Sequence, residues 1–366
     1  GVVLLGLALI PAFLFTGYQG LPTTGQHEVA QASAILVDHS RTDPFETDGS
    51  AREIPAHFYY PADAAASPTA QDASRETYPL VVFSHGAFGF YRSNYSTYME
   101  LASHGYVVVA LDYPHHAFIT TDTNGQTVRA DSTFLQTAVA AENNDLSDEE
   151  EFAITHEWLD LRCADLNFVL DTLESAGTSG VLDKGTWWFP STEDEEAVRH
   201  AMRVADTNRI GLAGHSLGGA TSVELGRTRD DVDAVIDIDG TMFGSELAFE
   251  DGSAVFDTTP YPVPLLSMDN ENHYLVGQQL GNDYVNNVVL DNAEDATHTY
   301  FVGSGHLNFT DLPLFSPALA SLLGTGPVDS EACVQQMNAL VLQFFDYYLK
   351  GEGEVDSIAT QYDPGA

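Results

Sequence analysis

One short run, Gly214-His215-Ser216-Leu217-Gly218-Gly219, limits most strongly what this chain can fold into. It directly follows the apolar stretch Ile210–Ala213 and directly precedes a helical pattern over Leu217–Arg227. A serine among glycines between a strand and a helix predicts a sharp, strained turn that exposes its hydroxyl at the carboxyl end of a sheet. The Gly-x-Ser-x-Gly pattern alone is weak, since about one chain in ten of this length matches it by chance. The strand–turn–helix context makes it specific.

The remaining strand patterns place this turn in a mixed α/β architecture. Pro79–Ser84 and Tyr106–Asp112 are continuous apolar runs, which are typical of parallel strands covered on both faces. Val29–Val37 and Ile54–Tyr60 are expected to form an antiparallel pair before them. Later strands alternate with helices, and the expected segments are strands Arg209–Ala213, Ala234–Ile238, Pro264–Met268 and Thr297–Val302 and helices Ser93–Gly105, Asp145–Ser175, Leu217–Arg227 and Cys333–Leu349.

This alternation predicts an α/β protein with a mostly parallel, doubly wound sheet and an antiparallel N-terminal strand pair. Together with the serine turn it predicts an α/β-hydrolase fold. The stretches Ala117–Asp145 and Gly177–Arg199 fit neither period and are expected to be helical insertions over one edge of the sheet.

We expect one large domain with distinct ends. Residues 1–16 are apolar throughout and, as a helix, would span about 24 Å against a hydrocarbon core of roughly 30 Å. They are interpreted as part of a membrane anchor or signal segment, with a buried core helix as the alternative. Residues 17–27 are expected to be a linker, 28–351 the catalytic domain and 352–366 a C-terminal tail. The body of the protein would then lie outside the cytoplasm, secreted or membrane-anchored.

The charge excludes one class of partner. With 13 Lys+Arg against 54 Asp+Glu, the formal net charge is −41, so nucleic acid partners are not expected. Such an acidic composition suggests that the protein comes from a halophilic organism, where salt screens the repulsion between its carboxylates. The alternative is an ordinary secreted acidic protein. The two cysteines, Cys163 and Cys333, form one disulfide or none. No motif for a metal or a nucleotide appears, and no cofactor is predicted.

A serine nucleophile needs a base, and on this fold the chain order is serine, then acid, then histidine. His306 fits best because it follows the last expected strand in the flexible loop Gly303-Ser304-Gly305-His306. Two other histidines also follow Ser216 in the chain. His298 lies inside a strand pattern, whereas His273 follows the neighbouring strand and remains a rival.

Two carboxylates compete for the role of the acid. Asp239 and Asp269 each end a strand, at the carboxyl edge where the acid must stand. Asp237 lies within its strand and is interpreted as a structural carboxylate. The spacing alone leaves Asp239 and Asp269 open.

The developing oxyanion needs amide donors. One is expected from Leu217, which follows the serine, and the other from the loop after Phe83, where Ala87 is the favoured residue. Aromatic residues near these loops either wall the substrate site or belong to the core; they are Phe88, Phe90, Tyr91, Tyr113 and Phe243.

Four blocks of sequence then resemble a known family. They are PLVVFSHGAFGFYRSNYSTYMELASHGYVVVALDYPHH (79–116), GHSLGGAT (214–221), IDIDGTMFG (236–244) and GSGHLNFTD (303–311). They resemble the plasma-type platelet-activating factor acetylhydrolases and their bacterial α/β-hydrolase relatives, in order from about Val29 to Lys350. The middle region Ala117–Arg199 is not obviously similar.

The resemblance implies a metal-independent serine acyl-enzyme acting on esters with short or oxidised acyl chains. It favours Asp239 as the acid and His306 as the base, with Ala87 and Leu217 as the oxyanion donors. Bacterial polyester hydrolases and cutinases share the serine turn more distantly, and there the acid follows the later strand, where Asp269 stands.

The expected function is therefore a serine esterase that hydrolyses short-chain carboxylic esters, with a small ester or a lipid as substrate. One alternative is a polyester or cutin hydrolase, acting on an aromatic or aliphatic polymer surface. Another is a catalytically inactive hydrolase-fold module that binds lipid.

Overall fold

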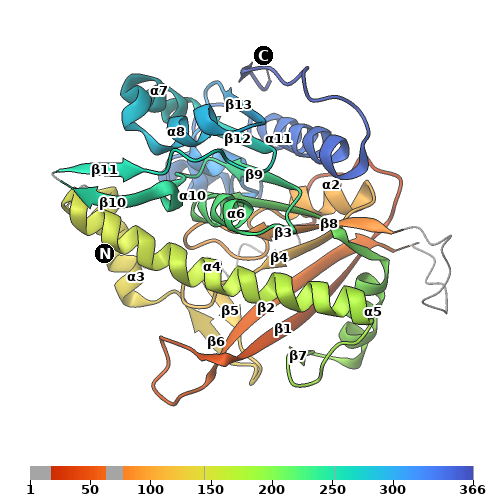
Figure 1. Ribbon diagram of the computed structural model, residues 1–366. Helices are drawn as coiled ribbons and strands as arrows, with labels where there is room; N and C mark the ends of the chain where they lie inside the picture. Colours follow the sequence, from red (N-terminus) through yellow and green to blue (C-terminus); the bar gives the residue numbers. More distant parts are fainter. Residues whose placement is uncertain (1–17, 63–76, 144, 251, 366) are drawn as a thin grey trace.

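The computed structural model describes residues 18–62, 77–143, 145–250 and 252–365 (Figure 1). The predicted membrane anchor or signal segment, residues 1–16, lies outside these ranges. Within them, no helix is both long enough and apolar enough to cross a membrane. Secretion and membrane anchoring therefore stay predictions.

The described residues form one ten-stranded sheet in the order β14-β13-β12-β9-β8-β3-β4-β2-β1-β7. The strands are parallel from β4 to β14, whereas β2 pairs antiparallel with both β4 and β1. This confirms the mostly parallel sheet and its antiparallel N-terminal pair. The strands of this sheet are β1 (Val29–Thr42), β2 (Ala51–Pro61), β3 (Tyr78–Ser84), β4 (Val107–Leu111), β7 (Trp187–Trp188), β8 (Ala205–His215), β9 (Ala234–Ile238), β12 (Leu265–Asn270), β13 (Ala296–Phe301) and β14 (Gln361–Tyr362).

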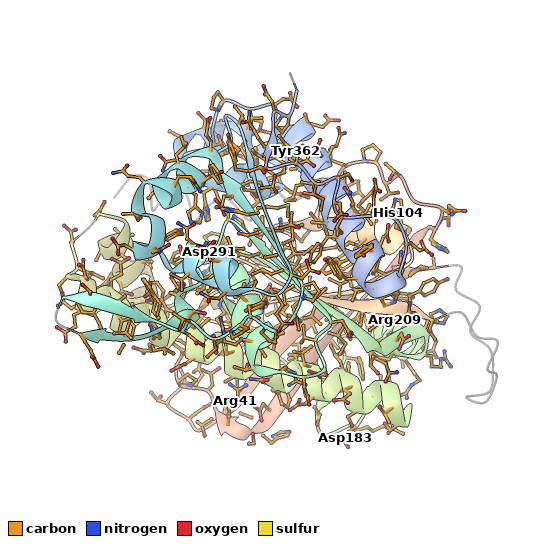
Figure 2. All side chains as sticks on the ribbon, turned by 45° about the horizontal axis from the view of Figure 1, so that its top comes forward. Arg41, His104, Asp183, Arg209, Asp291 and Tyr362 are labelled. Carbon is orange, nitrogen blue, oxygen red and sulfur yellow. The ribbon has the colours of Figure 1, made fainter. Side chains whose placement is uncertain are left out.

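Helices cover both faces of the sheet (Figures 1 and 2). Successive residues of β3 alternate between two cores: Leu80 and Val82 pack on the face of α4, α5, α6 and α8, whereas Val81 and Phe83 pack on the face of α2 and α11. The helices are α2 (Tyr95–Ser103), α3 (Ser132–Glu142), α4 (Asp148–Ser179), α5 (Thr192–Val204), α6 (Leu217–Thr228), α7 (Glu271–Leu280), α8 (Val285–Asn292), α9 (Leu312–Phe315), α10 (Pro317–Leu322) and α11 (Ser330–Phe345), with short turns η1 (Phe243–Ser245), η2 (Gly281–Asp283), η3 (His306–Phe309) and η4 (Asp346–Lys350).

The order of the strands places the functional loops together. From β3 the chain goes first to β4 on one side and later to β8 on the other side. The loops that follow β3 and β8 therefore lead away from each other at the carboxyl ends of these two strands. Such a reversal of strand order is a topological switch point, where open α/β sheets bind ligands. The loop at Ala87 follows β3, and Ser216 follows β8.

Some predicted segments have different bounds or different structure. Helix α4 begins three residues later than predicted, after a capping box of Ser147 and Glu150, and runs on to a left-handed Gly180. The predicted helical insertions are also partly strand: the first contains the hairpin of β5 (Ile119–Thr121) and β6 (Thr127–Arg129) before α3, and the second contains β7. A second hairpin, β10 (Glu246–Glu250) with β11 (Ser253–Phe256), was not predicted.

Both segments predicted to flank the catalytic domain contact it. Of the predicted linker 17–27, the described residues 18–27 lie against α2, where Leu21 N donates to Ser96 Oγ at 2.9 Å and Thr24 N donates to Glu100 Oε2 at 2.9 Å. The predicted tail also joins the fold, because β14 pairs with β13. The physical reason is that an edge strand leaves backbone groups open for pairing, and a two-residue strand is too short to show a pattern in the sequence.

Both cysteines are free thiols, which answers the question that the sequence left open. Cys163, on α4, packs against the core on one face of the sheet, whereas Cys333, on α11, belongs to the core on the opposite face. Burial raises the pKa of both thiols, that of Cys333 to about 12. They are therefore protonated and unreactive at neutral pH.

Candidate active site

Ser216 stands in a strained turn between β8 and α6, with φ 57° and ψ −125°. The flanking glycines make this turn sterically feasible. A Cβ on Gly214 would lie 2.2 Å from the carbonyl carbon of Gly218, and a Cβ on Gly218 would lie 2.0 Å from the carbonyl oxygen of Ser84. Only glycine fits at these two positions, so the local sequence dictates the turn that exposes the serine.

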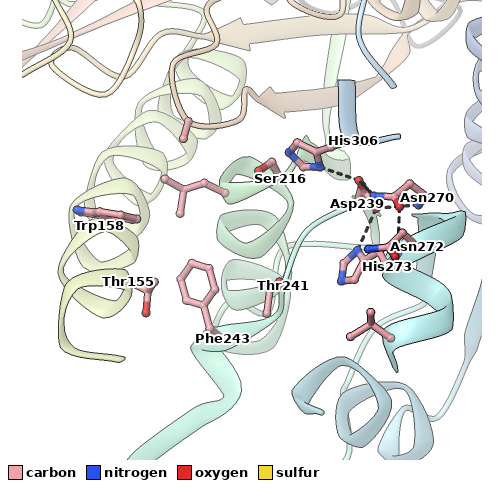
Figure 3. A pocket seen from close by; sticks show the side chains of 13 residues that line it. Thr155, Trp158, Ser216, Asp239, Thr241, Phe243, Asn270, Asn272, His273 and His306 are labelled. Carbon is pink, nitrogen blue, oxygen red and sulfur yellow. Dashed lines mark hydrogen bonds and ion pairs between the residues drawn. The ribbon is translucent and has the colours of Figure 1, made fainter. Parts of the chain in front are cut away.

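His306 and Asp239 meet beside this serine. Asp239 follows β9, His306 begins η3, and His306 Nδ1 donates to Asp239 Oδ2 at 2.6 Å. Figure 3 shows the imidazole of His306 between Ser216 and Asp239. Since an ionised carboxylate only accepts hydrogen bonds, this contact fixes the proton on Nδ1 and leaves Nε2 as the acceptor. The structure thus brings together the three residues that the sequence favoured.

Asp239 is fully engaged as a hydrogen-bond acceptor. Besides His306 it accepts from Asn270 N and Asn270 Nδ2, each at 2.7 Å, and from His273 Nδ1 at 2.9 Å. Burial alone would raise the pKa of Asp239, but the hydrogen bonds from His273 and His306 outweigh it and hold the pKa well below its usual range. The carboxylate is therefore ionised and fixed in orientation.

His273, the rival base, turns out to be a second donor to the same carboxylate. Its Nδ1 also lies 3.7 Å from Asp269 Oδ1, and its Nε2 contacts the hydroxyl of Tyr284. Burial lowers the pKa of His273, but the hydrogen bond to Asp239 and the charges of Asp269 and Asp239 raise it to about 9. At neutral pH this imidazolium balances a cluster of buried carboxylates, which sequence spacing alone did not show.

The charge of His273 predicts how stability changes with pH. Its folded pKa of about 9 exceeds the ordinary value of 6.5, so its contribution is full below pH 6.5 and is lost as pH rises through 9. This difference corresponds to about 3 kcal/mol. In the wild type, the free energy of unfolding should therefore decrease between these pH values. In His273→Gln, we expect this decrease to be absent, as measured by urea titration at several pH values. His298→Gln, which does not touch Asp239, should keep that decrease; equal slopes in wild type and His273→Gln would contradict the assignment.

The other two carboxylates of this region have different partners. Asp269 accepts from His298 Nε2 at 2.7 Å, and within the described ranges no hydrogen bond or ion pair joins it to His306. Asp237 is fully buried beneath the serine turn, and burial raises its pKa well above the usual range. A Cβ on Gly219 or Gly240 would lie 1.9 or 2.3 Å from its Oδ1, so these glycines make room for the carboxyl group.

A cavity of about 390 Å³ opens at Ser216 (Figure 3). Its walls come from the loop after β3, from α4, from the turn after β9 and from α7. The lining residues are Ala87, Thr155, Trp158, Ser216, Leu217, Asp239, Thr241, Phe243, Asn270, Asn272, His273, Val276 and His306. Both expected oxyanion donors, Ala87 and Leu217, therefore border the same space as the serine. Leu217 begins α6, where a backbone N–H has no partner within the helix.

Of the five aromatic residues predicted to wall the site, only Phe243 lines this cavity. Tyr113 and Phe90 are buried, Tyr91 stacks on His57 with ring centroids 3.7 Å apart, and Phe88 packs against Phe134. These four side chains belong to the packing behind the loops, because nearness in sequence to a loop does not decide which way a side chain points. None of these four lines the cavity at Ser216, which favours the alternative that they belong to the core.

The walls that the sequence missed come mainly from α4. Thr155 and Trp158 lie three positions apart, so they share one helix face, and both line the cavity (Figure 3). The sequence pattern predicted a helix here but did not show which of its side chains reach the cavity. The place of Trp158 at the N-terminal part of a long helix that extends past the sheet explains why it reaches the cavity.

One group of side chains within the described ranges has metal-ligand chemistry. Asp239, Asp269 and His273 offer ligand atoms that all lie within 4.8 Å of one another. Both oxygens of Asp239 already accept hydrogen bonds from His306, His273 and Asn270. A cation here would compete with the contact between His306 and Asp239.

A serine on a strained strand-to-helix turn, with an Asp–His pair at the switch point of a mostly parallel sheet, defines the α/β-hydrolase fold. Within this class, the family model for platelet-activating factor acetylhydrolase, isoform II, matches residues 56–363. The chain belongs to this family, which confirms the resemblance seen in the sequence.

Known proteins of the family resemble the chain at low identity. The platelet-activating factor acetylhydrolases of Bos taurus and Cavia porcellus are 26% and 25% identical, over 77% and 75% of this chain. The chain spans 59% and 58% of the length of these relatives. Among solved structures, a ferulic acid esterase from Streptomyces cinnamoneus matches with a TM-score of 0.64 and 22% identity, covering 93% of this chain and 96% of that one. This match confirms the predicted fold.

Proposed function

We propose that the protein is a serine esterase that cleaves short-chain carboxylic esters through an acyl-enzyme. The observation that carries this proposal is the hydrogen bond from His306 Nδ1 to Asp239 Oδ2 beside the strained Ser216. Family membership and the fold support a hydrolase. The names of the relatives in Bos taurus and Cavia porcellus, which are acetylhydrolases, agree with it.

In the proposed mechanism, Ser216 Oγ attacks the ester carbonyl while His306 Nε2 removes its proton. The amides of Ala87 and Leu217 stabilise the oxyanion that forms, an effect worth about 3 kcal/mol for one donor. His306 then gives the proton to the leaving alcohol, and Asp239 stabilises the imidazolium throughout. Water, activated by the same histidine, releases the acid and restores the serine.

The dimensions of the cavity favour a short acyl group. Trp158, Phe243 and Val276 contribute apolar surface around a space of about 390 Å³, which lies at the small end of ligand sites. The polar side chains of Thr155, Thr241 and Asn272 border the same space. We therefore propose a small ester, or a lipid with a short acyl chain, as the substrate.

The test is hydrolysis of p-nitrophenyl esters from acetate upward by the purified protein. The assay is run in molar salt. At a net charge of −41, the acidic side chains repel one another and destabilise the folded chain unless salt screens them. We expect kcat/KM to fall at least about tenfold beyond butyrate, because one methylene without room costs about 1–3 kcal/mol. A flat profile into medium chains would contradict the short-chain proposal and make polyester films the next substrate. No hydrolysis by the folded protein would instead favour an inactive lipid-binding module.

A further inference from the structure

A buried arginine lies behind the loop that carries Ala87. Arg162, from the middle of α4, is fully buried. Its Nη1 donates to the carbonyl of His85 at 2.6 Å, its Nη2 to the carbonyl of Gly86 at 3.4 Å, and its Nε to His116 Nδ1 at 3.3 Å. Its guanidinium also lies over the ring of Tyr113, 4.2 Å from the centroid. Two of its contacts are therefore backbone carbonyls of the loop that follows β3.

The partners of this arginine differ from those of the other buried arginine beside it. Arg52, equally buried, forms ion pairs with Asp43 at 2.9 Å and Asp165 at 2.7 Å. No carboxylate in the described part of the chain lies within ion-pair distance of Arg162. Burial lowers the pKa of Arg162 to about 10, so it stays charged at neutral pH. Asp165 and Asp112 act on this charge only from beyond ion-pair distance, and burying a charge without a direct ion pair is costly. The hydrogen bonds to the carbonyls of His85 and Gly86 offset part of this cost.

The two carbonyls that Arg162 holds determine where the neighbouring amides point. In a trans peptide the C=O and N–H groups point in opposite directions. The carbonyl of Gly86 accepts from Arg162, from His85 Nδ1 at 2.6 Å and from Gly89 N at 3.0 Å. The N–H of Ala87, across that same peptide, is therefore directed away from Arg162. Ala87 borders the cavity that contains Ser216.

We propose that Arg162 is a positioning residue of the oxyanion hole, which holds the Gly86–Ala87 peptide so that the Ala87 amide faces Ser216. This inference rests on the proposed esterase mechanism. Arg162 touches neither the substrate nor the reacting atoms and acts through the peptide. Its charge also polarises this peptide through the carbonyl, which makes the Ala87 N–H a stronger donor to a developing oxyanion.

The test compares Arg162→Met and Arg162→Lys with Arg52→Met, which removes an equally buried arginine that does not contact the loop. For each folded variant, kcat and KM are measured separately. The affinity of a trifluoromethyl ketone is measured too, because it mimics the tetrahedral intermediate. Ser216 Oγ adds to the ketone carbon, His306 takes the serine proton, and the former carbonyl oxygen becomes an oxyanion in the oxyanion hole. In Arg162→Met we expect kcat to fall about 10²- to 10³-fold, as when an oxyanion donor is lost. KM should stay within a few-fold, and ketone affinity should fall in parallel with kcat.

The lysine variant and the control make the result specific. Lysine keeps the charge but reaches one carbonyl at a time, so Arg162→Lys should recover part of the lost kcat. Arg52→Met should lower the free energy of unfolding and leave the kcat of the folded fraction within a few-fold. A folded Arg162→Met with unchanged kcat or unchanged ketone affinity would overturn the inference. If that variant does not fold, wild-type kcat in Arg162→Lys would overturn it equally.

A crystal structure of the Arg162 variant that folds separates this inference from the proposed function. We expect the Gly86–Ala87 peptide to be rotated there and unchanged in Arg52→Met. If the wild type hydrolyses no ester, the proposed function fails, yet the orientation of this peptide still decides whether Arg162 positions it. A peptide that keeps its orientation without the guanidinium would show that the other donors suffice and that the inference is wrong.

Discussion

Ser216→Ala is expected to lower kcat for ester hydrolysis by about 10⁵- to 10⁶-fold, the loss seen when a serine nucleophile is removed from such a triad. The amides of Ala87 and Leu217 remain in this variant, so a residual acceleration over water should persist. The measurement is the rate of p-nitrophenyl acetate hydrolysis in molar salt, combined with labelling by a fluorophosphonate. Wild type should be labelled with one equivalent, and Ser216→Ala should not be labelled.

A buried serine away from the cavity provides the control. Ser267 lies in β12, and its hydroxyl has no hydrogen-bond partner within the described part of the chain. Ser267→Ala should therefore keep wild-type activity and labelling. Ester turnover at the wild-type rate in Ser216→Ala would refute the acyl-enzyme mechanism.

Asp239→Asn is expected to lower kcat by about 10⁴-fold with little change in the fold. An asparagine has one acceptor oxygen in place of the two that His306, His273 and Asn270 now use. Its NH₂ group would face at least one of these donors and would favour the wrong tautomer of His306. The pre-steady-state rate of acylation measures this loss directly.

Asp269→Asn separates the two candidate acids. Asp269 accepts from His298 and lies near His273, so its loss should reduce kcat by less than about tenfold while it lowers stability by about 1–3 kcal/mol. A larger loss of kcat in Asp269→Asn than in Asp239→Asn would make Asp269 the acid, in the arrangement known from cutinases. The comparison is made on folded protein at a single pH and salt concentration.

The parts of the fold and site that the sequence predicted are those that depend on local pattern. Continuous apolar runs identified β3 and β4, and glycines around Ser216 identified the turn. Because carboxyl ends of parallel strands share an edge, the residues following β9 and β13 could also be expected near this serine. His306 and Asp239 do lie together there.

The remaining features depend on contacts between distant segments. Asp239 and Asp269 end neighbouring strands and look equivalent in sequence, and only the path of the loop after β13 decides which one His306 reaches. The direction of an aromatic side chain is equally non-local, so Tyr113 and Phe243 could not be told apart. Arg162 gave no signal at all, since an arginine within an acidic helix is usually exposed.

The single long helix α4 contributes to two different parts of the site. Its 32 residues extend over about 48 Å. The N-terminal part supplies Thr155 and Trp158 to the cavity, and one to two turns further on the same helix contributes Arg162 behind the Ala87 loop. On the proposed function, we expect substitutions at the first two positions to change acyl-chain preference and substitutions at the third to lower kcat. A library of variants for altered substrate selectivity should therefore randomise Thr155 and Trp158 and keep Arg162 unchanged.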